Sequence, residues 1–410
     1  MYRLLDGITV LDVTTIIFGP YASQILADLG ARVIKIEGTD GDLARYTSPA
    51  AEPGLGAMFA NNNRNKLNVA LDLKSDGGRE VMRRLVARAD CILHNMRPSA
   101  MKRLGFGFEA CTALNPRIVY CAAVGFGNHG PYAGRPAFDD IVQAASGLAS
   151  LTRVSANDSP RYFPSVIADK VAALHVAYSA LAALLSRERK GHAIEVEIPM
   201  FESLASFVLN EHLGAATFDA QAAPGYHRMF SPDRRPYRTK DGWIAALPYT
   251  GEQWRRFLIE IGRRDVTEQQ WLSNSAERNR RVGELYGILA SAMPDRMTAE
   301  WLETLEHLDI PHARVNDLDD LLRDPHLEAR GFFAPPSSAP IVRRSLAQPA
   351  TFRNVEQEPD TLSLGLGADT AFVLGEYGFS TDEIAIMAAN GSIVVGDRDS
   401  GKGEAGKRDE

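Results

Sequence analysis

Strands and helices alternate between residues 8 and 124, and this alternation constrains the fold more than any other feature of the sequence. The segment 8–14, ITVLDVT, has the continuous apolar character of a buried strand, and an amphipathic helix follows over 20–29. The segment 32–37, RVIKIE, predicts a second strand and completes a βαβ unit. Repeated units of this kind build a mostly parallel sheet with helices on both faces. Further strands are predicted at 67–73, 91–96, 117–124 and 193–198, and further helices at 77–89, 99–114 and 201–216.

The pattern changes after residue 216, where a smaller second domain is predicted. A locally basic loop leads into a hairpin, YRTKDGWIAAL, turned by Asp241 and Gly242, and helical patterns follow at 252–261, 276–293 and 298–308. The expected fold class is α/β, with a Rossmann-like, mostly parallel sheet in the large domain and a smaller α+β domain. We divide the chain into a first part of the large domain over 1–216, the small domain over 217–330, a segment returning to the large domain over 331–395 and a disordered tail over 396–410.

Composition and charge exclude several classes of function. The net charge is -7 and charged residues make up 24% of the chain, so no basic surface favours nucleic acid. The start has no signal-peptide pattern, and no window reaches the apolar length needed to cross a bilayer, so we expect a cytoplasmic protein. Its three cysteines, Cys91, Cys111 and Cys121, are then interpreted as reduced core thiols. The nine histidines lack metal-ligand spacing, and no metal site is expected.

The most apolar helix, predicted over 164–189, carries one acidic residue near its start, Asp169. From residue 171 to 185 nearly every position is apolar, which is typical of a helix buried on all sides. Ser165 stands at the N-cap position, so Asp169 falls in the first turn, where the helix dipole favours a carboxylate and burial raises its pKa. Two interpretations remain open. The carboxylate either complements the helix N-terminus at the surface, beside Lys170, or lies in a dry cleft as a nucleophile.

Two motifs match dinucleotide-binding fingerprints in part, and both fail on context. A GxGxxG at 125–130 follows a predicted strand, but Pro131 comes next and no helix opens there. Glu37 ends the second strand, where a ribose-binding acid would lie, but the preceding turn has only Gly19. The amides of the glycine-rich turn remain able to line a ligand site. The residues IIF at 16–18 are unusually apolar for a loop and predict an apolar wall for a ligand.

Basic residues recur near the predicted strand ends of the large domain. We expect most of them to be solvated and two or three to clamp phosphates. They are Lys35, Arg45, Arg64, Lys66, Arg97, Lys102 and Arg103.

Several blocks along nearly the whole chain, taken in order, resemble the family III CoA-transferases of the formyl-CoA and carnitine type. They include LDGITVLDVTTIIFGPYASQILADLGARVIKIE, ADCILHNMRPSAMKRLGF, NPRIVYCAAVGFGNHGPYAGRPAFDDIVQAASGL, the IADK segment around Asp169, and YRTKDGWI. The resemblance implies an enzyme that moves CoA from an acyl-CoA to a small carboxylic acid, with CoA compounds as substrates and no tightly bound cofactor. It also implies an interlocked homodimer, and neither nucleic acid nor a membrane is an expected partner.

The resemblance assigns roles to individual residues. Asp169 stands at the position of the family's nucleophile, which forms a mixed aspartyl anhydride and then an aspartyl-CoA thioester. Asp139 is a second catalytic candidate, and capping the helix that follows it is an equal alternative. CoA contacts are implied at Ile16, Ile17, Phe18, Leu71, Lys74, Asn95, Met96 and Arg103, with Lys35 as a weaker candidate.

Two departures from the family pattern bear on the reaction. Phe138 stands where the family's 2-methylacyl-CoA racemases carry a proton-transferring histidine, so a racemase or epimerase, the first alternative, loses a base. No run of glycines occurs near residues 240–251, which argues against oxalate and formate as substrates. A CoA-binding protein without catalysis is the second alternative.

In the basic loop of the small domain, His227, Arg228 and Arg234 either bind an acceptor carboxylate or form ordinary solvated surface.

Overall fold

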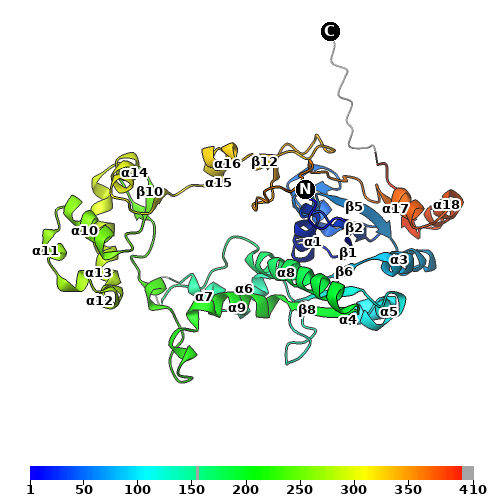
Figure 1. Cartoon of the computed structure of the whole chain (residues 1–410), viewed down its shortest axis with the longest axis horizontal. Coiled ribbons are helices and arrows are strands. Elements are labelled where there is room, and N and C mark those ends of the chain that lie inside the picture. Colours follow the sequence, from blue (N-terminus) through cyan, green and yellow to red (C-terminus); the bar gives the residue numbers. More distant parts are fainter. Residues whose placement is uncertain (154–156, 399–410) are drawn as a thin grey trace, which may run out of the picture. The chain divides into compact units, whose positions relative to one another are not determined.

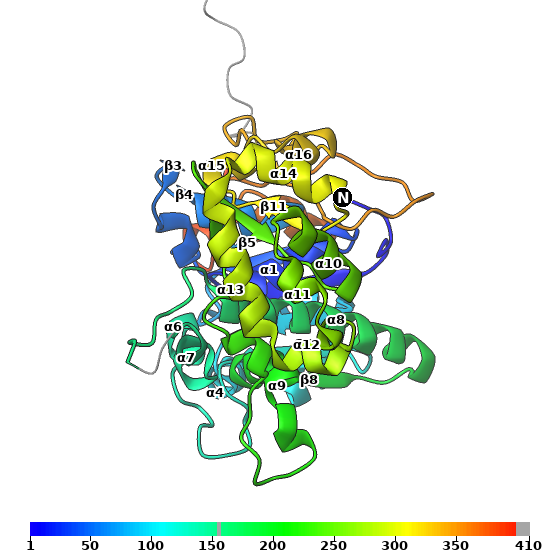
Figure 2. The ribbon, with the colours of Figure 1, turned by 90° about the vertical axis from the view of Figure 1, so that its left-hand side faces the viewer.

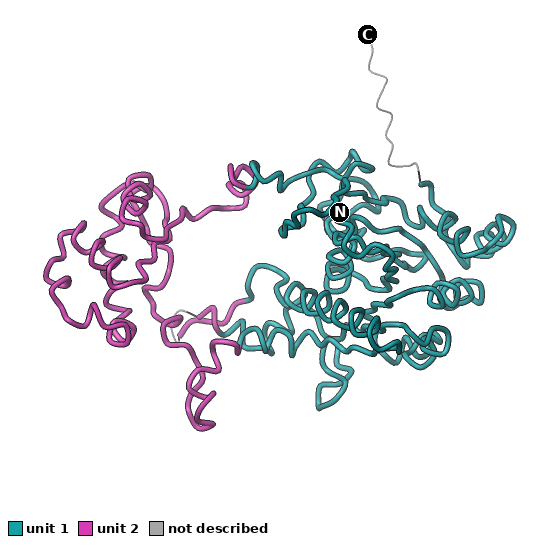
Figure 3. The backbone as a smooth tube through the Cα atoms, in the orientation of Figure 1, with its two compact units in different colours: residues 1–150, 162–208, 327–410 teal, residues 151–161, 209–326 magenta. Residues whose placement is uncertain are grey.

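The computed structural model describes residues 1–153 and 157–398, and Figure 1 shows its elements in chain order. Most of the predicted tail, 399–410, lies outside the described residues, whereas Arg398 pairs with Asp369 at 3.0 Å. By its internal contacts the chain divides into two compact units (Figure 3). Unit 1 comprises Met1–Ser150, Tyr162–Val208 and Leu327–Glu410, and unit 2 comprises Leu151–Arg161 and Leu209–His326.

Unit 1 contains a seven-stranded sheet in the order β14-β5-β2-β1-β6-β7-β8. All neighbouring strands are parallel except β14, which pairs antiparallel with β5, so the predicted α/β class with a mostly parallel sheet is confirmed. The order reverses between β1 and β6, and at such a point an open α/β sheet leaves a crevice beyond the carboxyl ends of its strands. The strands are β1 (Thr9–Val13), β2 (Arg32–Glu37), β5 (Lys66–Leu71), β6 (Cys91–His94), β7 (Val119–Val124), β8 (Ile194–Pro199) and β14 (Ile393–Val394).

Helices cover both faces of this sheet (Figure 1). One face shares a core with α3 (Asp76–Arg88), α4 (Pro98–Leu104), α5 (Phe108–Leu114), α17 (Thr370–Glu376) and α18 (Thr381–Ala389). On the other, α1 (Phe18–Asp28) packs against α8 (Ile167–Lys190), which also contacts β7 and β8. The single helix predicted over 99–114 is wrong, because Gly105 adopts a left-handed φ of 88° and ends α4 there. All three cysteines are buried and free, as predicted.

Helix α8 is buried on one side only, so the prediction of burial on all sides is wrong for the single chain. Its buried side is rich in small residues such as Ala172 and Ala180, which allow the neighbouring elements to approach closely. The larger residues Leu174, Tyr178 and Leu185 are 51%, 55% and 55% exposed. We call these three residues the α8 stripe. Contrary to the sequence expectation, α8 is also long and apolar enough to cross a membrane by composition, with half of its most apolar window buried in the protein.

Four of the seven basic residues noted near the strand ends are buried in unit 1, so the prediction that most of the seven are solvated is wrong. A buried charge is tolerated only where an opposite charge and hydrogen bonds compensate for lost water, and each of the four has a carboxylate partner. The partners come from other strands, turns and helices, so local sequence does not reveal them. The pairs are Lys35 with Asp42 at 2.9 Å, Arg45 with Glu37 at 2.7 Å, Lys66 with Asp12 at 3.0 Å, and Arg64 with Asp28.

Unit 2 has its own core, formed by a small antiparallel sheet and several helices (Figure 2). The predicted hairpin is present as β9 (Tyr237–Arg238) and β10 (Trp243–Ala246), and β11 (His312–Arg314) adds a third strand. Around them pack α10 (Gly251–Glu260), α13 (Val282–Ala292) and α14 (Thr298–His307). The helix predicted over 276–293 is two helices, α12 (Ser275–Arg280) and α13.

Candidate active site

The N-terminus of α8 is capped by a residue from another helix. Oδ1 of Asp139 accepts the backbone N–H of Ala168 at 2.7 Å and that of Asp169 at 3.2 Å. The predicted cap Ser165 does not serve, because Val166 occupies the N-cap position and no side-chain hydrogen bond caps the helix from there. Asp139 is the first residue of α6 (Asp139–Ala145), so its carboxylate caps α8 rather than the helix that it begins. We therefore regard Asp139 as a positioning residue for Asp169.

A third side chain holds Asp139 in place. Nε2 of Gln143 donates to Oδ2 of Asp139, and Oε1 of Gln143 accepts the N–H of Phe163 at 2.8 Å. Both carboxylate oxygens of Asp139 are therefore occupied, and its side chain is buried. This arrangement ties the segment before α8 to α6 and fixes the orientation of the first turn, on which Asp169 lies.

The Asp169 carboxylate is half-buried and lacks a neutralising partner. Among the residues that the structure describes, none forms an ion pair or hydrogen bond with its oxygens, and Nζ of Lys170 donates to Oγ of Ser165 at 2.9 Å instead. Burial and, to a smaller extent, the nearby charge of Asp139 together raise the pKa of Asp169 to about 7. A carboxyl group perturbed in this way is typical of a functional site rather than of a surface helix terminus.

The loop after β1 is held in a strained conformation at the point where the strand order reverses. Ile16 has a φ of 71°, which is rare for a β-branched residue and costs roughly 1–3 kcal/mol. Its N–H is shared by the two carboxylate oxygens of Asp42 at 3.1 and 3.2 Å. On the other side of this peptide, Asn95 accepts the N–H of Thr15 at 3.0 Å and donates to the Thr15 carbonyl at 2.9 Å. Asn95 thus joins the ends of β1 and β6.

The structure buries some of the residues with implied CoA contacts and leaves others near the surface. Ile17 and Phe18 are buried at the start of α1, and Leu71 lies in the core, so their side chains do not face solvent. Lys35 is enclosed in its ion pair with Asp42, which removes it as a phosphate clamp. The remaining candidates lie nearer the surface: Ile16, Asn95 and Met96 are half-buried, and Lys74 and Arg103 are exposed.

A cavity of about 270 Å³ lies at the carboxyl ends of β6 and β7. Asn95 and Met96 line it, and so do Arg97, Arg135 and Phe138, which directly precedes Asp139. The guanidinium of Arg135 lies 4.4 Å from the ring centre of Tyr132. Sequence reasoning missed Arg135, although a basic residue in a Gly- and Pro-rich loop after a predicted strand is a usable signal. The cavity lies at the carboxyl edge of the sheet, where open α/β sheets bind ligands, one strand along from the reversal between β1 and β6.

Both dinucleotide-like motifs are partly engaged by contacts within the chain. The N–H of Gly127 bonds Glu202 at 3.1 Å and that of Asn128 bonds Glu197 at 2.9 Å, so these amides of the glycine-rich turn already face carboxylates. A Cβ at Gly125 would lie 2.3 Å from the Cβ of Ala137, so close packing explains this glycine. Glu37 is buried in its pair with Arg45.

The fold and the site define a class of protein: an α/β protein with an unpaired carboxylate at a helix N-terminus and a ligand cavity at the carboxyl edge of its sheet. Within this class the chain belongs to CoA-transferase family III, whose sequence profile matches residues 5–370. The resemblance seen in the sequence is thereby confirmed, and the protein is an enzyme, a CoA-transferase.

Individual relatives support the same assignment. A protein named as a probable fatty acyl-CoA transferase from Mycobacterium tuberculosis is 32% identical over 315 residues, covering 74% of this chain and 80% of that protein. The (R)-2-hydroxy-4-methylpentanoate CoA-transferase from Clostridioides difficile is 28% identical over 389 residues, covering 93% and 97%. The crystal structure of a CaiB/BaiF family protein from Brucella suis matches with a TM-score of 0.79 at 25% identity, covering 92% of this chain and 100% of that one.

Proposed function

We propose that this enzyme moves CoA from an acyl-CoA to a small carboxylic acid through covalent intermediates on Asp169. The observation that carries the proposal is the Asp169 carboxylate, half-buried at the N-terminus of α8 without a partner among the described residues. An unpaired carboxylate is free to attack a carbonyl carbon, and its raised pKa reflects a carboxylate that water and donors stabilise poorly.

The proposed reaction splits one exchange into two symmetrical halves. An oxygen of Asp169 attacks the thioester carbonyl, the C–S bond breaks, and CoA leaves as the thiolate. The thiolate then attacks the Asp169 carbonyl of the mixed anhydride, which releases the donor acid as a carboxylate and leaves an aspartyl-CoA thioester. The acceptor carboxylate attacks this thioester and expels the thiolate, which finally attacks the acceptor acyl carbon and restores Asp169. No proton transfer and no resident cofactor are required by these steps.

We further propose a homodimer. Its support is the α8 stripe, since exposed large apolar residues that share one side of a helix favour contact with another protein surface. The proposal that the acceptor is a small carboxylic acid rests on the relatives, which are named as CoA-transferases for several different organic acids.

Trapping with hydroxylamine tests the proposed function directly. When the protein is mixed with an acyl-CoA and hydroxylamine, the aspartyl-CoA thioester should be captured as a hydroxamate at Asp169 and located by peptide mass spectrometry. A racemase would instead wash deuterium from solvent into the carbon next to the thioester, and a non-catalytic CoA-binding protein would do neither. Phe138 offers no group for proton exchange, which disfavours the racemase.

The rate of transfer should depend on pH through Asp169. Only the ionised carboxylate is nucleophilic, and burial followed by the charge of Asp139 raises its pKa to about 7. We expect kcat/KM to rise about tenfold per pH unit below pH 7 and to level off above it. A pH profile of initial rates checks this, and a level profile between pH 5 and 8 would contradict it.

Replacing Asp139 by asparagine should move that profile to lower pH. The amide oxygen of Asn still accepts the two N–H groups of α8, but the negative charge that raises the pKa of Asp169 is removed. Asp140→Asn makes the same change in charge at an exposed neighbour and should leave the profile unchanged. An acidic limb that stays in place, or moves upward, in Asp139→Asn would show that Asp139 does not act on Asp169 electrostatically.

A further inference from the structure

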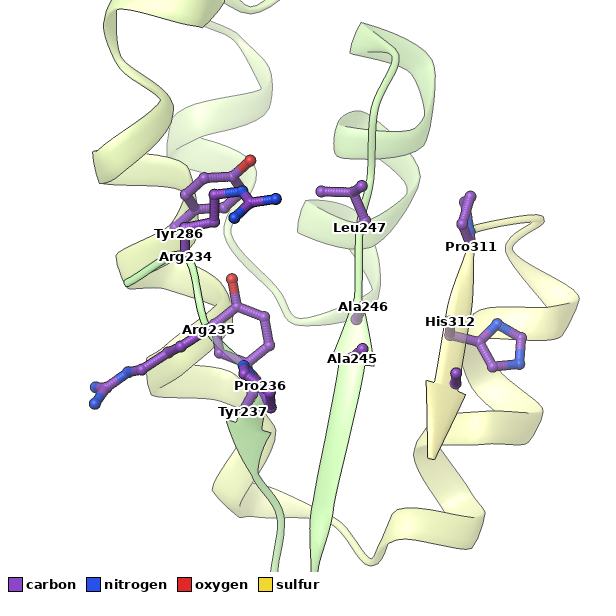
Figure 4. A pocket seen from close by; sticks show the side chains of 11 residues that line it. Arg234, Arg235, Pro236, Tyr237, Ala245, Ala246, Leu247, Tyr286, Pro311 and His312 are labelled. Atoms are coloured by element: carbon purple, nitrogen blue, oxygen red, sulfur yellow. The ribbon is translucent and has the colours of Figure 1, made fainter. Parts of the chain in front are cut away.

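Unit 2 contains a cavity of about 430 Å³, a size typical of small-molecule sites, bounded by β9, β10, β11 and α13 (Figure 4). Its lining is mostly apolar. Tyr237 and Tyr286 supply aromatic surface, and Ala246, Leu247 and Pro311 supply aliphatic surface. None of these residues was singled out by sequence reasoning, and the proposed chemistry at Asp169 does not use them.

One cation faces this apolar space. The guanidinium of Arg234 extends toward Leu247 in Figure 4. Within residues 1–153 and 157–398, Arg234 forms no salt bridge and its side chain makes no hydrogen bond. Its neighbour Arg235 also lines the cavity, but its guanidinium extends away from Leu247 in Figure 4 and lies 3.6 Å from Asp233. The two adjacent arginines therefore have opposite surroundings.

A phenol group, that of Tyr286, lines the same cavity as the Arg234 cation. Tyr286 is 1% exposed, and its hydroxyl oxygen accepts a hydrogen bond from Nε of Arg228 at 2.8 Å. That bond fixes the ring and leaves the phenol's own O–H proton as a donor, for which the described residues provide no acceptor. A guanidinium and a phenol O–H together match the two oxygens of a carboxylate.

We propose that this cavity binds a monocarboxylic acid with a compact apolar body, and that it recognises the acid substrate. The identification as substrate rests on the proposed transferase function, whereas the binding itself does not. The carboxylate pairs with Arg234 and Tyr286, and the hydrocarbon part contacts the aromatic and aliphatic walls. A second carboxylate would lie against these apolar walls without a partner, which is costly, so dicarboxylic acids bind more weakly.

Binding of three six-carbon compounds to the full-length protein tests the proposal. We expect hexanoate to bind at least about tenfold more tightly than hexanamide, which lacks the charge, and than adipate, which carries two charges. Arg234→Leu should weaken hexanoate binding by about 10- to 100-fold, whereas Arg235→Leu, which removes the same charge next to it, should change it less than about twofold. Titration calorimetry measures all five affinities.

Several outcomes would overturn the proposal. They are equal binding of hexanoate and hexanamide, equal effects of the two arginine substitutions, or saturable binding of none of the three compounds. Hydroxamate formation by the unaltered protein, measured in parallel from an acyl-CoA without added acid, reports on the proposed function alone. Selective hexanoate binding without a hydroxamate would leave the cavity assignment standing and remove the transferase mechanism. A hydroxamate without selective hexanoate binding would leave the transferase mechanism standing and remove the cavity assignment.

Discussion

Replacing Asp169 by asparagine is expected to abolish CoA transfer, with a loss in kcat of about a thousandfold or more. Asparagine is nearly isosteric with aspartate but is not a nucleophile, so neither the anhydride nor the aspartyl-CoA thioester forms. The capping bonds at the start of α8 use the backbone N–H groups of Ala168 and Asp169, and both remain in the variant. The fold should therefore be retained. Mass spectrometry of the CoA products measures the transfer.

Asp140→Asn is the matched control for this substitution. Asp140 lies next to the capping residue, is exposed, and loses the same charge. The Asp140→Asn variant should transfer CoA at the rate of the unaltered protein, and the hydroxamate at Asp169 should form in it normally. If Asp169→Asn transferred CoA at the parental rate while circular dichroism showed a normal fold, the covalent mechanism would be refuted.

Replacing Asp12 by alanine is expected to have the largest effect on stability, lowering the free energy of unfolding of unit 1 by about 3 to 5 kcal/mol. Asp12 is fully buried on β1, where it pairs with Lys66 at 3.0 Å and accepts a hydrogen bond from Ser23 at 2.6 Å. Burial alone would raise its pKa, but the charges of Lys66 and Lys35 and the hydrogen bonds from Ser23 and Thr14 together lower it. Removing the carboxylate leaves the buried ammonium group of Lys66 without its compensating charge.

Denaturant-dependent hydrogen exchange of the backbone amides in the strands of unit 1 measures this loss in the free energy of unfolding. Asp76→Ala provides a comparison, because Asp76 pairs with Arg79 on the surface of α3 and its side chain is fully exposed. Salt screens such a pair, and the variant should unfold at nearly the same denaturant concentration as the parent. Similar shifts for the two substitutions would show that the buried network does not stabilise unit 1.

Much of the fold follows from local pattern. The strand RVIKIE was predicted over 32–37, and β2 (Arg32–Glu37) has the same limits. The hairpin of unit 2 was also predicted, since Asp241 and Gly242 are favourable turn residues. Two predictions about helices were wrong, the single helix over 99–114 and the burial of α8 on all sides. The left-handed φ of Gly105 divides a continuous helical pattern, and the alternation of small and large side chains on α8 leaves one apolar side exposed.

The candidate site was only partly predictable. The position of Asp169 in the first turn of an apolar helix could be inferred from spacing, but its surroundings could not. Its capping partner Asp139 is 29 residues from Ala168 in sequence. Arg234 was a sequence candidate for binding an acceptor carboxylate, but the sequence did not reveal the apolar cavity that it lines. A sequence shows which charges exist but not which of them find partners.

The sequence by itself therefore determined the alternation of strands and helices, the parallel sheet that follows from it, and the acidic residue at the start of α8. These features depend on side chains close together along the chain. Only the tertiary structure decided which charges are buried in pairs, such as Lys66 with Asp12 across 54 residues. It also decided which charges have no partner among the residues that it describes, such as Asp169 and Arg234. The reason is physical: pairing depends on distances between packed elements, and local backbone preferences do not contain those distances.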